Sequence, residues 1–213
     1  MNLKAQLDLC RQYMLDFHAH DYSGHDIAHV ERVTSLALKI AKAEQCQRID
    51  IVEIASLLHD TVDSKLTTSD AATIKLEKFL YSINLDTLTI NEIIFIIKHL
   101  SYRNGENNQI SLSLEGQIVR DADRLDAIGA IGIARAFQFA GHFNEPMWTE
   151  LPTSSIPSAD EITTFEPSAI RHFYDKLLKL KDLMHTETAR NIAIQRHDFM
   201  KQFINQFFDD WYQ

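Results

Sequence analysis

Histidine and aspartate side chains that can bind a metal ion are concentrated in four short stretches of the chain. These are His25 and His29, then His59-Asp60 followed by Lys65, then His99, and finally the run Asp121 to Asp126, which contains Asp123. Imidazole nitrogens combined with carboxylate oxygens suit a first-row divalent ion such as Mn²⁺, Fe²⁺, Ni²⁺ or Zn²⁺. The two cysteines form no cluster, which argues against a structural zinc site. We therefore predict an open metal site of the catalytic kind.

Helical spacing allows these side chains to converge. Two pairs are separated by about one turn and share a helix face: His25 with His29, and Asp123 with Asp126. On a regular helix His59 and Asp60 point about 100° apart, so both reach one ion only if it lies between their directions near the helix end. Such a site forms where inward-pointing side chains of several helices meet. Asp63 and Asp126 are either part of this site or helix-surface charges.

The elements that must position these residues are expected to be helices. Apolar residues recur at helical spacing along almost the whole chain, and Gly and Pro number only 6 and 4. The helices expected from this spacing cover about 3–17, 26–40, 50–60, 69–81, 89–100, 113–136, 167–184 and 187–211, with a polar loop over 103–110. Capping-box spacing is present at Asp50 with Glu53 and at Thr89 with Glu92. The sequence therefore predicts an all-α fold.

The segment 141–166 lacks helical periodicity and contains three of the four prolines. Proline obstructs a continuous helix, and Pro167 suits the first turn of the helix that follows. Long irregular segments in compact domains are usually functional covers or disordered. Two interpretations are open: a cover over the metal cleft that brings Trp148 toward a nucleoside base, or a surface crossover to the C-terminal helices.

Length and charge limit the function classes. With 213 residues, a single domain is the starting expectation. The 30 acidic residues exceed the 21 basic ones, giving a formal charge of −9, so the overall field repels polymeric nucleic acid and anionic membranes. No apolar run approaches the ~18 residues of a membrane span, and no targeting segment is visible. Cys10 and Cys46 are expected to be buried thiols in a reducing compartment, which favours a cytoplasmic protein.

The order of these residues resembles a known family. His29, then His59-Asp60, then Asp123 within Asp-Ala-Asp-Arg-Leu, is similar to the H…HD…D signature of HD-domain phosphohydrolases, and in particular to small stand-alone bacterial members. The resemblance covers the chain to about Phe139 and, less specifically, the last two helices. It implies an HD-domain helical bundle with a C-terminal helix pair, forming one HD-type domain over 1–213. Its expected parts are a metal-binding core at about 20–140, a proline-bearing loop at 141–166, and C-terminal helices at 167–211.

The resemblance also implies the residues that hold the metal. When each ligand position of the family signature is matched to this sequence, the resemblance implies His29, His59, Asp60 and Asp123 as the ligands. Asp121 is the rival of Asp123, because it lies two residues away and faces the other side of a helix. The implied cofactor is a divalent metal ion, with Mn, Fe, Ni, Zn and Mg all compatible with the family.

The activity implied by the resemblance is metal-dependent hydrolysis of a nucleotide or a related phosphate ester through metal-activated water. Asp60 is expected to accept the proton of that water, while His99, His25 and Lys65 neutralise charge on the transferring phosphoryl group. Lys65 lies two residues later than the lysine of the related HDxGK motif. His25 either contacts the phosphate or caps the turn after Gly24. A non-catalytic, metal-dependent nucleotide sensor is the alternative function, and a homodimer is left open.

Overall fold

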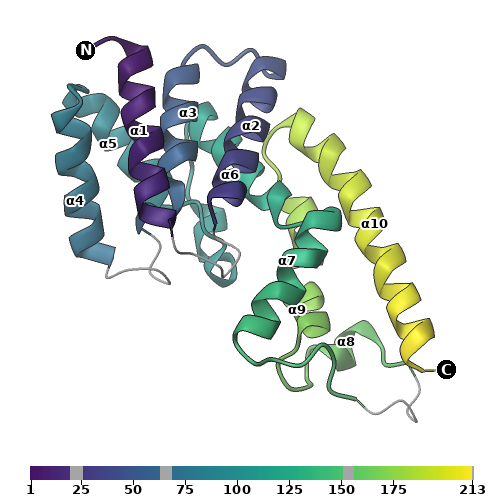
Figure 1. Ribbon diagram of the computed structural model, residues 1–213. Coiled ribbons are helices and arrows are strands. Elements are labelled where there is room, and N and C mark those ends of the chain that lie inside the picture. The colour runs from purple at the N-terminus through teal and green to yellow at the C-terminus, as the bar shows by residue number, and fades with distance from the viewer. Residues whose placement is uncertain (20–25, 63–68, 151–155, 213) are drawn as a thin grey trace. The chain divides into compact units, whose positions relative to one another are not determined.

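The computed structural model describes residues 1–19, 26–62, 69–150 and 156–212 (Figure 1). Within these ranges every regular element is a helix, so the predicted all-α class is confirmed. None of the helices in these ranges is long and apolar enough to cross a membrane. The chain divides into two compact units, residues 1–123 and 124–213.

The first unit contains most of the helices, and its elements follow one another with short connections. They are α1 (Leu3–His18), α2 (Ile27–Ala43), α3 (Ile49–Leu58), the 3-10 turn η1 (His59–Val62), α4 (Ser69–Ser82), α5 (Thr87–Lys98), the 3-10 turn η2 (Arg103–Gln109) and α6 (Leu114–Asp126), whose last residues enter the second unit. The second unit then holds α7 (Gly129–His142), α8 (Ala159–Ile162), α9 (Ala169–Asp175), the 3-10 turn η3 (Leu177–Leu183) and α10 (Glu187–Trp211).

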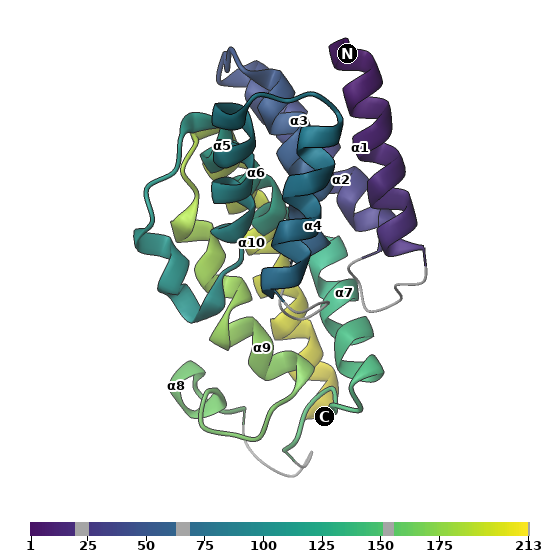
Figure 2. The ribbon, with the colours of Figure 1, turned by 90° about the vertical axis from the view of Figure 1, so that its left-hand side faces the viewer.

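Helix α3 forms the centre of the first unit, because almost every side chain on it is apolar. Seven of its residues are completely buried: Ile51, Val52, Ile54, Ala55, Ser56, Leu57 and Leu58. A helix that is hydrophobic on all sides must be covered on all sides. Accordingly α3 packs against α1, α2 and α5, and it continues directly into η1. Helix α5 contacts α3, and α4 packs in turn on α5 (Figure 2).

Two helix boundaries agree closely with the sequence-based expectation. Helix α2 begins directly after Asp26, and α10 covers the expected 187–211. Both expected capping boxes are wrong. Helix α3 has Arg48 at its N-cap without a side-chain hydrogen bond, so Asp50 lies in the first turn, where a carboxylate complements the helix dipole. Helix α5 is capped by Asp86, whose carboxylate accepts hydrogen bonds from two backbone amides and starts the helix before the expected Thr89.

The long helix expected over 113–136 is interrupted at residues 127–128. Gly129 begins α7 with φ of +79°, in the left-handed region where L side chains are strained. A Cβ at Gly129 would lie 2.9 Å from Cγ of Arg196, and one at Gly132 would lie 2.2 Å from the Ala127 carbonyl oxygen. The two glycines therefore allow the tight turn at residues 127–128 from which α7 begins.

The expected single helix over 167–184 is also wrong. Ser168 caps α9, so Pro167 precedes the helix instead of occupying its first turn. The α-helix ends at Asp175, and the chain continues as the 3-10 turn η3. The polar segment expected at 103–110 contains another 3-10 turn, η2. Short 3-10 turns of this kind carry weak sequence signals, because they lack a sustained 3.6-residue pattern.

The described parts of 141–166 are irregular except for the end of α7 at 141–142 and for α8, and they are anchored to α10. Trp148 is buried, its indole Nε1 donates to the Tyr212 hydroxyl at 2.9 Å, and its ring packs edge-on against Phe165 and Phe208. The indole of Trp211 donates in turn to the Glu150 carbonyl oxygen at 2.9 Å. Trp148 thus serves as an anchor within the second unit. Its ring is enclosed by aromatic side chains of the same unit, while the interpretation of 141–166 as a cover that brings Trp148 toward a nucleoside base stays a prediction.

The two cysteines are buried free thiols, as expected. Burial raises the pKa of the Cys10 thiol to about 12, with a smaller contribution from the nearby Glu53 carboxylate. Burial also raises the pKa of Cys46, whose thiol donates to the Glu115 carboxylate. Both side chains therefore act as neutral, unreactive core residues at physiological pH.

Candidate metal centre

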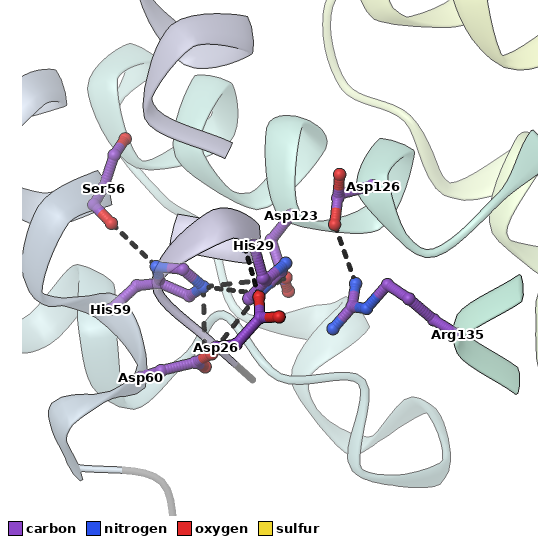
Figure 3. A network of polar contacts seen from close by, with 8 residues as sticks. All are labelled: Asp26, His29, Ser56, His59, Asp60, Asp123, Asp126 and Arg135. Carbon is purple, nitrogen blue, oxygen red and sulfur yellow. Dashed lines mark hydrogen bonds and ion pairs between the residues drawn. The ribbon is translucent and has the colours of Figure 1, made fainter. Parts of the chain in front are cut away.

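Four of the predicted site residues come together in the first unit. His29 lies in the first turn of α2, His59 and Asp60 begin η1, and Asp123 lies near the end of α6 (Figure 3). Three different local features position them. His29 lies at a helix start, His59 and Asp60 lie where a helix end tightens into a 3-10 turn, and Asp123 lies within a helix. The side chains are therefore delivered by elements separated by 30 to 64 residues of sequence.

The two histidines and Asp123 form a compact group of ligand atoms. Nε2 of His29 lies 3.2 Å from Nε2 of His59. The Asp123 Oδ1 atom lies 3.7 Å from the first of these nitrogens and 3.8 Å from the second. One ligand atom from each of the three residues lies within 4.8 Å of the other two. Atoms at this separation can contact one ion placed between them.

Asp60 joins the group by contacting both histidines. Its Oδ2 lies 3.3 Å from Nε2 of His29, and its Oδ1 lies 3.4 Å from Nε2 of His59. The 100° divergence between His59 and Asp60 is accommodated because α3 ends at Leu58 and the chain tightens into η1. The cluster therefore does lie at a helix end, as the spacing required. We refer to His29, His59, Asp60 and Asp123 as the four-residue cluster.

The hydrogen bond made by the other ring nitrogen fixes the orientation of His59. Nδ1 of His59 lies 2.7 Å from the Ser56 carbonyl oxygen, which can only accept, so Nδ1 carries a proton (Figure 3). In the neutral imidazole the lone pair is then on Nε2, the atom that faces the cluster. A backbone acceptor behind a histidine is the usual arrangement for a metal ligand. The sequence offered no signal for this contact, since the acceptor is a backbone atom.

Asp26 positions His29 from the start of α2. Its carboxylate caps the helix and accepts a hydrogen bond from the His29 backbone N–H at 2.8 Å. The cap fixes the first turn, from which the buried His29 side chain projects. Sequence analysis placed the helix start here but assigned Asp26 no role in the site. The available signal was an aspartate three residues before a ligand histidine at a helix start.

We predict that Asp26→Ala lowers the free energy of unfolding by about 1 kcal/mol, the usual cost of losing an N-cap side chain. Asp26→Asn should retain most of the stability, because asparagine caps helices about as well as aspartate. Chemical denaturation of both variants checks this. Equal losses in the two variants would contradict a capping role and would point to the charge of Asp26 instead.

The structure distinguishes the two rival aspartates by position. Asp123 is partly exposed at the cluster, whereas Asp121, two residues earlier on α6, is completely buried. Asp126 forms an ion pair with Arg135 in the second unit, with Nη1 of Arg135 and Oδ2 of Asp126 2.9 Å apart. Asp126 is buried and has a structural partner, so it is not the helix-surface charge that was one of its two interpretations.

His99 is the other predicted site residue that the structure describes, and it is not part of the four-residue cluster. His99 follows α5, where its Nδ1 lies 2.7 Å from the Phe95 carbonyl oxygen and its ring packs on Phe95. In the described part of the chain it makes no ion pair with the cluster. His25, Asp63 and Lys65 lie outside the described residues, so their expected roles stay predictions.

The donor set fits a divalent cation. Two buried imidazoles and two carboxylates face one another, which is the nitrogen and oxygen combination preferred by first-row divalent ions. Asp123 has no Lys or Arg partner within the described ranges, and its contacts there are the two histidines. A bound cation would offset this negative charge and use the lone pair of His59.

Comparison with known proteins identifies the family. A model of the HD domain matches residues 26–128, a range that contains the whole four-residue cluster. The Bacillus subtilis protein YpgQ is 39% identical over 207 residues, which cover 96% of this chain and 93% of YpgQ. The chain belongs to the HD-domain superfamily.

Several solved structures are similar to the chain over almost its whole length. A Lactobacillus plantarum protein is 38% identical with a TM-score of 0.84, over 99% of each chain. YpgQ in complex with ADP is 36% identical with a TM-score of 0.78, over 99% of this chain and 97% of YpgQ. An HD-superfamily hydrolase from Bacillus thuringiensis is 33% identical with a TM-score of 0.76, over 99% and 98% of the two chains. These structures extend the similarity beyond residues 26–128, which the family model matches.

Proposed function

We propose that this HD-domain protein is a metal-dependent phosphohydrolase that acts on a nucleotide or a related phosphate ester. The observation that carries the proposal is the convergence of two buried histidines and two carboxylates with ligand atoms 3.2 to 3.8 Å apart. Membership of a superfamily that includes hydrolases supports the reaction class. The ADP complex of YpgQ supports a nucleotide as the ligand class.

In this proposal His29, His59, Asp60 and Asp123 hold one divalent ion. When bound, such an ion lowers the pKa of a coordinated water and polarises a phosphoryl oxygen. The Ser56 carbonyl keeps His59 in the tautomer that presents a lone pair, and the Asp26 cap holds the turn that presents His29. The ligand atoms are thus oriented before an ion arrives, which lowers the reorganisation needed for binding.

Asp60 is proposed to act as the proton acceptor. Its side chain is buried at the cluster, where each carboxylate oxygen contacts a different histidine. Transfer of a proton from the attacking water to Asp60 lets the oxygen form a bond to phosphorus as the bond to the leaving group breaks. His99, His25 and Lys65 are proposed to neutralise the charge on the transferring phosphoryl oxygens.

A panel of nucleoside mono-, di- and triphosphates, cyclic nucleotides and simple phosphate monoesters tests this proposal. Protein loaded with Mn²⁺ is incubated with each compound, and the products are identified by mass spectrometry, with EDTA-treated protein as the control. Metal-dependent release of phosphate or pyrophosphate, greatest with nucleotides, is the expected result. Saturable nucleotide binding without turnover of any compound would contradict it and favour the alternative, a metal-dependent nucleotide sensor.

A further inference from the structure

Arg120 is an arginine of α6 that is completely buried in the first unit. Its guanidinium spans two backbone carbonyls: Nη2 donates to His99 at 2.9 Å and Nη1 donates to Ile110 at 3.2 Å. These carbonyls lie at the two ends of the connection between α5 and α6, the first directly after α5 and the second directly after η2. One side chain therefore fastens both ends of this connection to α6.

Burying a guanidinium is costly, so its position calls for a specific role. Removing a charged group from water is unfavourable, so a buried arginine must be held by hydrogen bonds such as these two. The planar guanidinium of arginine can donate to two acceptors at once in a fixed geometry. The ammonium group of lysine, on a flexible stem, does not fix the directions of its hydrogen bonds in this way. The two-carbonyl bridge made by Arg120 uses this property.

Arg120 shares one face of α6 with Asp123 and Gly116. Successive helical residues are rotated by about 100°, so positions four and seven residues after Gly116 return to within roughly 40° of its direction. At Gly116 the helix approaches α5 so closely that a Cβ would lie 2.9 Å from Cγ1 of Ile96. The same face of α6 therefore contacts α5 at Gly116 and donates a hydrogen bond to the end of α5 through Arg120. It also carries Asp123 of the four-residue cluster.

Helix α5 connects this face to the other half of the cluster. It packs against α3 and against η1, the turn that carries His59 and Asp60. The separation between Asp123 and the histidine of η1 thus depends on how α6 is held against α5. The structure places Arg120 one turn before Asp123, at the point where α6 is fastened to the end of α5.

We infer that Arg120 is a positioning residue that sets the distance between Asp123 on α6 and His59-Asp60 on η1. This inference rests on the proposed metal site and adds to it a buried residue outside the four-residue cluster. Loss of the bridge should let α6 shift relative to α5, so that Asp123 no longer meets the other three ligands at an optimal distance.

Titration calorimetry with Mn²⁺ alone tests this inference in the full chain. Arg120→Met is expected to weaken Mn²⁺ binding by about ten- to 100-fold, the usual range for removing a residue that orients a ligand. Arg120→Lys keeps the charge but not the fork, so it should show an intermediate loss. It also serves as the second variant if Arg120→Met does not fold. Amide hydrogen exchange should become faster at residues 99–110 in both variants.

Arg48→Met is the matched control. Arg48 also reaches α5, through an exposed ion pair with Glu92 at 2.6 Å, but it does not lie on α6. Its Mn²⁺ affinity should equal that of the unmodified protein. Faster exchange at 99–110 with unchanged Mn²⁺ affinity in both Arg120 variants would overturn the inference, because Arg120 would then be only structural. If the unmodified protein binds no Mn²⁺, the proposed metal site fails as well, whereas absence of turnover alone leaves the inference intact.

Discussion

Replacing His59 and Asp60 together by alanine is expected to abolish divalent-metal binding and to reduce hydrolysis by at least about 1,000-fold. The reason is geometric: these two residues contribute a nitrogen and two oxygens to a cluster whose other members are His29 and Asp123. The unmodified protein at a metal concentration 100 times its Kd should gain about 2.7 kcal/mol in stability. For a chain of this size that corresponds to a rise in Tm of roughly 5–11 °C.

The variant should show no such rise, and elemental analysis should find no bound metal after reconstitution. His142→Ala is a suitable control, because this histidine is exposed at the end of α7 and lies outside the cluster. Metal content and thermal stabilisation in the control should match those of the unmodified protein. A double variant that still binds one equivalent of metal would show that the ligands are elsewhere.

Asp123→Asn is expected to lower mainly the affinity for the metal, and Asp121→Asn is expected to lower mainly the free energy of unfolding. The Asp123 carboxylate faces the two histidines and is partly exposed, so its loss should weaken metal binding by more than about 100-fold with little change in folding. Asp121 is completely buried, so its substitution should lower the free energy of unfolding by about 1–3 kcal/mol. Its metal affinity should change far less than that of Asp123→Asn.

Calorimetric titration with Mn²⁺ and urea denaturation of the same two preparations check this pair. Because the two substitutions are chemically identical and lie two residues apart on one helix, each is the control for the other. A greater loss of Mn²⁺ affinity in Asp121→Asn than in Asp123→Asn would mean that the wrong aspartate has been assigned to the site.

Local signals in the sequence were sufficient for the helices whose ends are set by their own residues. Asp26 is a strong N-cap residue, and α2 begins after it. The corner at residues 127–128 could not be predicted from periodicity, because the apolar pattern continues through it. Gly129 adopts its left-handed conformation where it packs closely on the side chain of Arg196, which is 67 residues away in sequence.

The site shows the same division between local and long-range information. The residue types, their order and the position of His59-Asp60 at a helix end were predicted from the sequence, and the structure brings those side chains together. The Ser56 carbonyl behind His59 could not be found in this way, because any residue supplies a backbone acceptor. The burial of Trp148 could not be predicted from the sequence, because its surroundings are decided by aromatic residues of α10 and by Phe165, which only the fold brings near.

Anomalous diffraction from crystals grown with Mn²⁺ would test the metal centre most directly. The arrangement of the four-residue cluster predicts an anomalous peak within ~2.0–2.3 Å of Nε2 of His29 and Nε2 of His59. Carboxylate oxygens of Asp60 and Asp123 should complete the protein ligands at similar distances. A fully occupied metal bound elsewhere, or no peak between these four side chains at saturating Mn²⁺, would contradict the assignment.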